Sequence, residues 1–221
     1  MHEIDLGSDL LASNEQLAKQ NRALFDEHRV YVFNLMSAPG SGKTSLLERT
    51  LPKIRDRFNV SVIEGDIQST KDADRIRSLG IDAFQINTGS LCHLDARMIH
   101  NSLHHFDLHG LDMIIIENVG NLVCPAEFDL GEDQRVMVYS VTEGHDKPKK
   151  YPLMFFRSDL ILINKTDLIP HTDFDLGKAR KETVDVNSRA DIIELSCKTG
   201  EGFDRWLAWL DGKVIAKKGK K

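Results

Sequence analysis

Residues 37–44 read SAPGSGKT, and the segments on either side give this short stretch its structural meaning. A run of β-forming residues, Val30 to Met36, precedes it, and a helical pattern beginning Ser45-Leu46-Leu47 follows it. Glycines between a strand and a helix let the backbone fold around an anion, so that its N–H groups and the helix N-terminus face the charge. The pattern predicts a phosphate-binding P-loop, although Ser37 replaces the usual leading glycine. A helix-capping turn with an incidental lysine is the alternative.

Short β-rich runs alternate with helical patterns along the rest of the chain. Several of these runs, such as residues 113–116, are continuously apolar, which suits strands buried on both faces of a parallel sheet. We therefore expect an α/β P-loop NTPase fold, a three-layer sandwich whose mostly parallel, twisted sheet of about seven strands carries helices on both faces. The expected strands lie near Val30–Met36, Val60–Glu64, Ala83–Asn87, Met113–Glu117, Val136–Val141, Leu160–Asn164 and Ile192–Leu195.

Composition narrows the class of protein. The chain has 221 residues, of which 41% are hydrophobic, enough for a sizeable core. Its net charge of −5 gives no overall attraction to nucleic acid or anionic lipid, so neither partner is expected. The apolar runs are too short to cross a membrane, and the N-terminus lacks the pattern of a secretory signal, so the cytoplasm is the expected compartment.

The two ends of the chain differ from the middle. Leu10, Leu17 and Leu24 recur every seven residues, so residues 1–28 are expected to form an amphipathic helix that packs on the domain through this stripe. Residues 29–212 are expected to form the P-loop domain, and residues 213–221 a basic tail. The lysines of that tail are expected to be solvated: Lys217, Lys218, Lys220 and Lys221.

Asn164-Lys165-Thr166-Asp167 follows an expected strand and resembles the NKxD motif of GTPases. A fixed carboxylate at Asp167 can accept from both N1–H and the 2-amino group of guanine, a pattern that adenine does not offer, while the stem of Lys165 can cover the ring. Ser196-Cys197-Lys198 resembles the loop whose backbone N–H contacts the guanine oxygen. GTP or GDP is therefore the expected nucleotide. Its expected contacts are Pro39, Gly40, Ser41, Gly42, Lys43, Thr44, Ser45, Gly120, Asn164, Lys165, Asp167, Ser196, Cys197 and Lys198.

The apolar run at residues 113–116 ends in Glu117, with Gly120 three residues further on. This pattern looks like the Walker B and switch II region, where the acid can hold Mg²⁺ and the glycine N–H can contact the γ-phosphate. Asp66 is a candidate switch I carboxylate, with helix capping as the alternative. The predicted magnesium ligands are Thr44, Asp66 and Glu117, and the predicted catalytic residues are Lys43, Asp66 and Glu117.

Three cysteines at wide spacings, Cys92, Cys124 and Cys197, do not resemble a disulfide framework. Cys92 and His93 are expected near a helix N-terminus, where the helix dipole favours a thiolate. Cys124 lies four residues after Gly120, so a rearrangement that follows the γ-phosphate should move its sulfur. Cys92, His93 and Cys124 would form an incomplete set for four-coordinate Zn²⁺ or Ni²⁺. The alternative is two separate buried cysteines and a capping histidine.

Four segments together resemble the hydrogenase nickel-incorporation GTPases of the HypB family: residues 37–44, 88–96, 117–127 (ENVGNLVCPAE) and 164–167. The resemblance implies a cytoplasmic GTPase of the SIMIBI class that dimerises on binding GTP. It also implies a nickel or zinc site on Cys92, His93 and Cys124 near the subunit contact. The implied role is to help load nickel into [NiFe]-hydrogenase, with a HypA-type nickel chaperone and the hydrogenase large subunit as partners.

Two departures from relatives in the family limit what the resemblance carries over. Residues 1–30 contain no cysteine and only His2 and His28, so nickel storage is not expected. Arg97 stands where some relatives have a further histidine. His100 and His104 follow His93 on one helical face, and we expect them to form a solvated histidine-rich surface.

The expected activity is Mg²⁺-dependent hydrolysis of GTP to GDP and phosphate, coupled to metal binding or release. No arginine finger or glutamine that positions water can be assigned, so the intrinsic rate is expected to be slow. The alternatives are a urease-accessory nickel GTPase, a metabolic phosphotransferase in which Cys124 merely packs, and a metal carrier whose nucleotide site is only structural.

Overall fold

The computed structural model describes residues 6–66 and 71–219. Within them seven parallel strands form one sheet in the order β3-β2-β4-β1-β5-β6-β7, which confirms the expected α/β class. The strands are β1 (Tyr31–Ser37), β2 (Val60–Asp66), β3 (Asp82–Asn87), β4 (Met113–Glu117), β5 (Gln134–Ser140), β6 (Leu160–Asn164) and β7 (Asp191–Glu194). Each overlaps its predicted segment, with bounds that differ by at most two residues.

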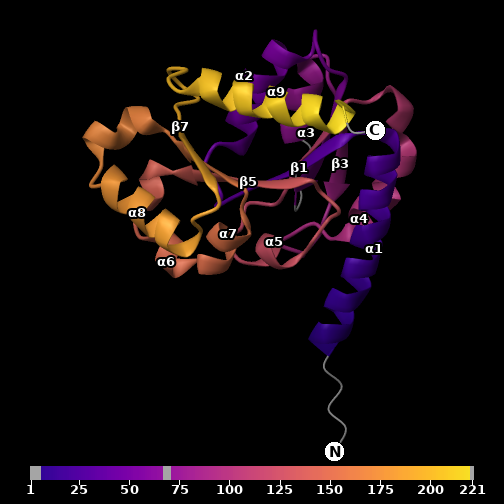
Figure 1. Cartoon of the computed structure of the whole chain (residues 1–221), viewed down its shortest axis with the longest axis horizontal. Coiled ribbons are helices and arrows are strands. Elements are labelled where there is room, and N and C mark those ends of the chain that lie inside the picture. Colours follow the sequence, from indigo (N-terminus) through magenta and orange to yellow (C-terminus); the bar gives the residue numbers. More distant parts are fainter. Residues whose placement is uncertain (1–5, 67–70, 220–221) are drawn as a thin grey trace, which may run out of the picture.

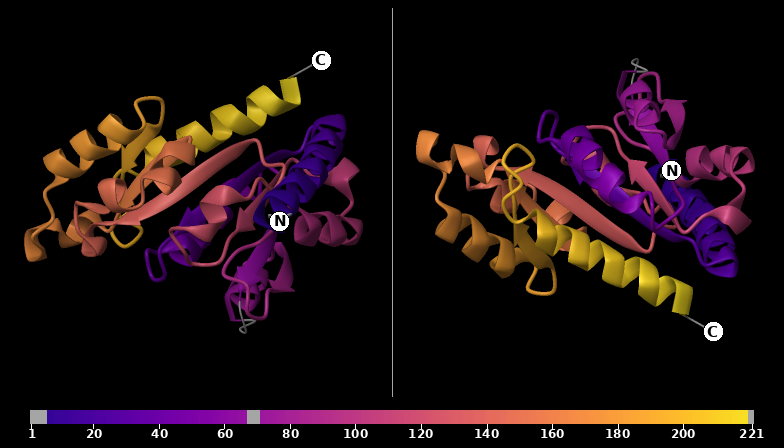
Figure 2. Two further views of the ribbon diagram at one scale, coloured as in Figure 1. Left: turned by 90° about the horizontal axis from the view of Figure 1, so that it is seen from below. Right: turned by 90° about the horizontal axis from the view of Figure 1, so that it is seen from above.

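Helices cover both faces of this sheet (Figures 1 and 2). One face packs against α2 (Lys43–Ile54), α3 (Lys71–Ser78) and α9 (Phe203–Gly219). The other packs against α1 (Leu6–His28), α4 (Ala96–Ser102), α5 (Cys124–Glu127), α7 (Pro152–Arg157) and α8 (Leu176–Val186), with α6 (Lys147–Lys150) beside α8. Short 3-10 helices complete the chain: η1 (Leu103–His105), η2 (Leu108–Gly110), η3 (Val141–Glu143) and η4 (Thr166–His171).

The central strands are buried on both faces, as their apolar runs predict. All residues of β1 and β4 are buried. Successive side chains of a strand point to opposite faces, so Phe33 packs on the side of Trp206 in α9, and Val32 packs on the side of Phe25 in α1. The apolar sequence of each strand therefore supplies both halves of the core.

The N-terminal helix packs through a stripe that only partly matches the expected one. Leu10 is exposed, and the buried positions are instead 14, 18, 21 and 25. Asn14 and Asn21 in this stripe are buried because the side-chain amide groups find backbone partners on the domain. The predicted helix is observed over Leu6–His28. The predicted packing stripe is wrong for Leu10, whereas Leu17 and Leu24 are half-buried and Leu24 packs against the core.

The C-terminal lysines also differ from expectation. Helix α9 continues to Gly219, and Lys217 lies on the same helical face as the buried Leu210 and Val214. Its ammonium group pairs with Asp26 of α1 and with Asp133, just before β5. Solvation is thus wrong for Lys217, while Lys218 is partly exposed and pairs with Asp112. Lys220 and Lys221 lie outside the described residues.

The parallel arrangement brings functional segments to one edge of the sheet. In open α/β sheets, ligands bind beyond the carboxyl ends of the strands. Here those ends carry Ser37, Asp66, Glu117, Ser140 and Asn164. Among residues 6–66 and 71–219, no helix has both the length and the apolar character that crossing a membrane requires.

Candidate nucleotide and metal site

The P-loop connects β1 to α2, as predicted. Lys43 begins the helix with a buried side chain, and its Nζ donates to Ser37 Oγ at 3.2 Å. Ser37, which stands in place of the usual leading glycine, thus accepts a hydrogen bond from Lys43 through its hydroxyl. Gly42, with φ of 105°, provides the left-handed turn into the helix, and no described side chain caps the first turn of α2. The first N–H groups of α2 are therefore available to an anion.

Glu117 brings a carboxylate to the start of α2. Thr44 Oγ1 donates to Glu117 Oε1 at 3.0 Å, and Lys43 Nζ lies 3.9 Å from the same oxygen. Glu117 Oε2 is buried with no hydrogen-bond partner among the residues described. A hydroxyl beside a carboxylate with a spare oxygen is a donor set that fits Mg²⁺. Asp66 lies half-buried at the end of β2, whose residue Glu64 is in register with Glu117.

Glu64 is a site residue that the sequence analysis missed. It is 2% exposed, and its Oε1 has no hydrogen-bond partner within the described part of the chain. Burial, and secondly the charge of the neighbouring Glu117, raise the pKa of Glu64 to about 10. Burial also raises the pKa of Glu117, against the charge of Lys43. The burial of this pair and the repulsion between its two carboxyl groups therefore favour the protonated form of Glu64. Its signal in the sequence is an acid that directly follows the apolar pair Val62-Ile63 within the β2 segment.

The predicted base-binding segments converge on a cavity of about 370 Å³. Asp167 Oδ1 accepts from Ser196 Oγ at 2.6 Å, which fixes the carboxylate. Asn164 Nδ2 donates to the carbonyl of Ser41 at 2.9 Å, and its Oδ1 accepts from Cys197 N–H at 3.2 Å. Asn164 therefore joins the P-loop to both base-binding loops. The cavity is lined by Gly42, Ser45, Asn164, Lys165, Asp167, Leu168, Cys197 and Lys198.

Two further residues of these loops, Lys165 and Cys197, are held by contacts or by burial. Lys165 Nζ donates to the carbonyl of Gly40 at 2.7 Å, so its stem runs from the NKxD segment to the P-loop. Burial raises the pKa of the Cys197 thiol to about 11, which keeps it neutral at physiological pH. Cys197 lies apart from the cluster formed by Cys92, His93 and Cys124 and has the loop position that the sequence favours.

The structure brings Cys92, His93 and Cys124 together. One ligand atom from each lies within 4.8 Å of the others, and all three residues are half-buried. The two sulfur atoms are 2.8 Å apart, and Cys92 Sγ lies 4.0 Å from His93 Nδ1. Burial lowers the pKa of His93, which favours the neutral imidazole that binds metals. The geometry thus favours a metal site over the alternative of separate cysteines.

A short segment links this cluster to the P-loop. Asn118 follows Glu117 directly, and its Oδ1 accepts from the N–H of Leu94, next to His93, at 3.0 Å. Gly120 lies so close to the P-loop that an added Cβ would be 3.0 Å from Pro39 Cα. The same segment then carries Cys124. Residues 117–124 therefore contact both the predicted phosphate site and both halves of the metal cluster.

The two helical histidines do not join the cluster. His100 Nδ1 lies 2.9 Å from Asn21 Oδ1 of α1, so the expectation of a solvated position is wrong for this residue. His104 is exposed, and its ring packs against His105. Asn21 shields His100 because α1 lies along α4 (Figure 1).

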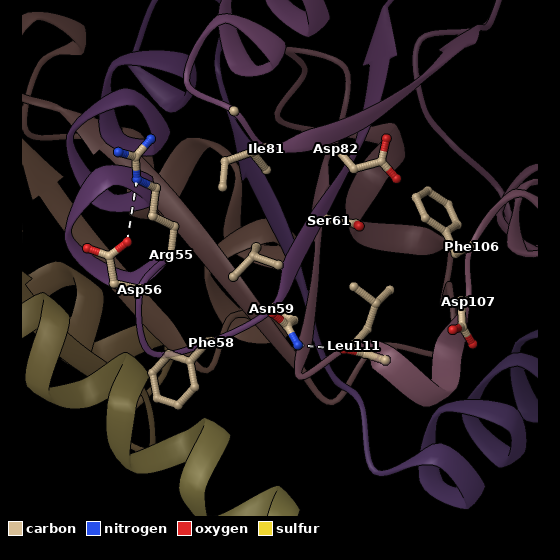
Figure 3. A pocket seen from close by; sticks show the side chains of 13 residues that line it. Arg55, Asp56, Phe58, Asn59, Ser61, Ile81, Asp82, Phe106, Asp107 and Leu111 are labelled. Carbon is tan, nitrogen blue, oxygen red and sulfur yellow. Dashed lines mark hydrogen bonds and ion pairs between the residues drawn. The ribbon is translucent and has the colours of Figure 1, made fainter.

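A larger cavity, of about 600 Å³, lies at the opposite edge of the sheet, where β2 and β3 begin. Figure 3 shows Arg55 and Asp56 on one side of it and Phe106, Asp107 and Leu111 on the other. None of the predicted site residues lines this cavity. The chemistry-bearing groups gather instead at the carboxyl edge.

Comparison with known proteins identifies the family of this chain. The family model for the CobW/HypB/UreG nucleotide-binding domain matches residues 31–194. The hydrogenase maturation factor HypB of Azotobacter vinelandii is 51% identical over 203 residues, which cover 92% of this chain and 67% of that protein.

Two solved structures are similar over nearly the whole chain. Hydrogenase maturation factor HypB from Archaeoglobus fulgidus has a TM-score of 0.87 and 44% identity, and the match covers 92% of this chain and 99% of that one. HypB from Helicobacter pylori, solved in complex with nickel, has a TM-score of 0.87 and 37% identity, with coverage of 92% and 96%.

Proposed function

Because this chain belongs to the HypB hydrogenase maturation factors of the CobW/HypB/UreG family, we propose that it is a GTP-hydrolysing switch that binds nickel and releases it during maturation of [NiFe]-hydrogenase. One observation carries the proposal: the segment 117–124 begins at the P-loop and ends in a cysteine of the metal cluster. A change at the nucleotide therefore has a direct mechanical route to the metal.

Guanine recognition rests on the fixed carboxylate of Asp167. Its hydrogen bond from Ser196 holds it at the cavity beside the P-loop, where it can accept from two donors on the guanine edge. The loop Ser196-Cys197-Lys198 would supply the backbone N–H that contacts the guanine oxygen. The phosphates would face Lys43 and the uncapped first turn of α2.

Thr44 and Glu117, together with Asp66, are the residues that would hold Mg²⁺. When bound, the ion offsets the negative charge that develops on the transferred phosphoryl group. Lys43 contributes positive charge at the same place, and the Gly120 N–H would contact the γ-phosphate. Because no arginine finger is assigned, slow intrinsic turnover is expected, accelerated by a partner or a second subunit.

Cys92, His93 and Cys124 supply two sulfur ligands and one nitrogen ligand for Ni²⁺ or Zn²⁺. A fourth ligand would come from water or from a second copy of the chain, in line with GTP-dependent dimerisation. The nickel complex of the Helicobacter pylori relative supports nickel as the cargo. We further propose a HypA-type nickel chaperone and the hydrogenase large subunit as partners in the cytoplasm.

The test is a titration of wild type and Cys124→Ala with Ni²⁺ and Zn²⁺, each with GDP and with a non-hydrolysable GTP analogue, while mass is measured in parallel. Wild type should bind metal with an affinity that differs between the two nucleotides, and should dimerise with the analogue. Cys124→Ala should lose the site, whereas Cys197→Ala should retain it, because Cys197 lies outside the cluster.

Each alternative function gives a different result. Metal affinity that is identical with GDP and with the analogue would favour a carrier whose nucleotide site is structural. Phosphate transfer to a small molecule, with no metal bound, would favour a phosphotransferase. Equal nickel binding by wild type and Cys124→Ala would remove Cys124 from the site.

A further inference from the structure

The buried stripe of α1 contains two asparagines where a helix packed on an apolar core would ordinarily carry apolar residues. A buried amide costs free energy unless its donors and acceptors are satisfied. Asn14 and Asn21 are 7% and 0% exposed, and both side chains are bonded to groups outside the helix. Their backbone partners, Ala96, Asp129 and Leu130, lie in the two segments that carry the residues of the metal cluster.

Asn14 bonds to two separate segments at once. Its Oδ1 accepts from the N–H of Ala96 at 2.8 Å, and its Nδ2 donates to the carbonyl of Asp129 at 2.8 Å. Ala96 lies three residues after His93, and Asp129 lies five residues after Cys124. A single amide group thus joins the two segments that carry the metal ligands.

Asn21 repeats this connection two turns further along the helix. Its Nδ2 donates to the carbonyls of Ala96 at 2.9 Å and Leu130 at 3.0 Å. Its Oδ1 lies 2.9 Å from His100 Nδ1 on α4. Together the two asparagines bind the backbone N–H and the carbonyl of Ala96 and two successive carbonyls of the other segment.

Close packing also holds the segment at residues 128–131 against α1. The backbone at Gly131 approaches α1 so closely that an added Cβ would be 2.7 Å from the Ala18 carbonyl and from Asn21 Cβ. Arg22 forms an ion pair with Asp129 at 2.8 Å. Between these contacts and Cys124, Phe128 stacks on the ring of His93 with centroids 4.0 Å apart. Displacement of either segment from α1 would therefore alter the position of a ligand.

We propose that Asn14 and Asn21 are positioning residues of the metal site, which set the separation between the Cys92–His93 segment and the Cys124 segment. The inference rests on the proposed metal function of these three residues. Groups that orient ligands from outside the coordination sphere commonly change metal affinity by about 10- to 100-fold. An asparagine suits this role because one amide offers a donor and an acceptor in a fixed geometry and does not titrate.

The test compares Asn14→Ala and Asn21→Ala with wild type in Ni²⁺ titrations against a competing chelator, together with the thiolate-to-nickel charge-transfer absorption. We expect affinity to fall about tenfold in each variant and the absorption band to shift or weaken. Asn187→Ala is the matched control. Asn187 is 5% exposed, and its Nδ2 donates to the carbonyls of Phe155, Phe156 and Ser158, none of which belongs to the segments 92–96 and 124–130.

The control should lose stability without a change in nickel affinity or spectrum. Affinity and spectrum equal to wild type in both α1 variants would overturn the inference and show that the asparagines only anchor the helix. If the alanine variants do not fold, Asn14→Asp decides, because it keeps the acceptor for Ala96 N–H and removes the donor to Asp129. Failure of wild type itself to bind nickel through Cys124 would instead refute the proposed function.

Discussion

Asp167 illustrates how a single side chain can set the choice of base. Its carboxylate is held by Ser196 at the cavity that adjoins the P-loop. Asp167→Asn replaces an acceptor with a donor that faces the donors of guanine, so affinity for GDP should fall about 10³-fold or more, while xanthosine diphosphate should regain much of it. Titration with fluorescent nucleotides measures both affinities.

Asp173→Asn provides the control for the lost carboxylate, because Asp173 is exposed and does not line the base cavity. Its affinity for GDP should equal that of wild type. Unchanged GDP binding by Asp167→Asn would remove this residue from the base site.

Cys197 should respond to pH unlike an ordinary thiol. Burial raises its pKa to about 11, so the reactive thiolate forms only as pH rises toward that value. At pH 8, alkylation of Cys197 should be about 100-fold slower than alkylation of an unperturbed thiol, and its rate should rise about tenfold per pH unit up to pH 10. Peptide mass spectrometry after timed iodoacetamide treatment measures the rate at this cysteine.

An introduced cysteine at an exposed position, Ser188→Cys, supplies the unperturbed comparison. Equal rates at Cys197 and at this position at pH 8 would contradict the assigned environment.

At the scale of elements, α9, α1 and the start of β5 meet at one charged group. Lys217 is 4% exposed and pairs with Asp26 and with Asp133, whose other oxygen accepts from the N–H of Val32. Lys217→Ala would leave Asp133 without its countercharge in a partly buried place and remove packed methylene groups. We expect the free energy of unfolding to fall by about 2 to 3 kcal/mol, measured by urea denaturation.

Lys218 offers the adjacent control on the same helix. Its pair with Asp112 is partly exposed, so Lys218→Ala should cost about 0.5 kcal/mol or less. A similar small loss in Lys217→Ala would mean that α9 is held to the domain by its apolar face alone.

The sequence predicts elements well where periodicity and burial agree. The central strands β1, β4 and β6 carry apolar runs and are buried throughout, and β-forming segments recur along the rest of the chain, so the seven strands and their order along the chain could be predicted. The packing face of α1 could not. The leucine spacing suggests a stripe of Leu10, Leu17 and Leu24, and only Leu24 of these packs against the core. The helix also buries Asn14 and Asn21, because their partners are carbonyl and N–H groups more than 70 residues away in sequence. The burial of Lys217 could not be predicted for the same reason, because its partners Asp26 and Asp133 are distant in sequence.

For the whole molecule, convergence of the predicted motifs follows from topology. Parallel strands place all their carboxyl ends at one edge, so the P-loop, Glu117 and Asn164 come together once the strand order is known. Cys92, His93 and Cys124 are predicted as one metal site through the family resemblance, because the local sequence leaves separate buried cysteines as an alternative. The local sequence does not predict Glu64, whose role depends on its register opposite Glu117, nor Asn118, whose partner Leu94 lies on another loop.

Asn118 leads to a prediction about the coupling of the two sites. The coupling factor is the ratio of the nickel affinity with the GTP analogue bound to the nickel affinity with GDP bound. Thermodynamic linkage requires that nickel change the ratio of the two nucleotide affinities by this same factor. Wild type should show a factor of about 5 or more, equal in both directions. The two measurements are nickel titrations at saturating nucleotide and nucleotide titrations at saturating nickel.

Replacement of Asn118 should reduce this factor while leaving both sites in place. The Asn118 side chain accepts from the N–H of Leu94 and donates to Asn34 Oδ1 at 3.2 Å in the buried centre of the sheet. Asn118→Ala removes that joint but none of the proposed ligands, so nickel and GDP should still bind while the coupling factor approaches one. Asn187→Ala, which loses a buried amide elsewhere, should retain the wild-type factor. If Asn118→Ala retains it too, the coupling must pass through Gly120 and Cys124 along the chain, without the cross-link to the Cys92–His93 segment.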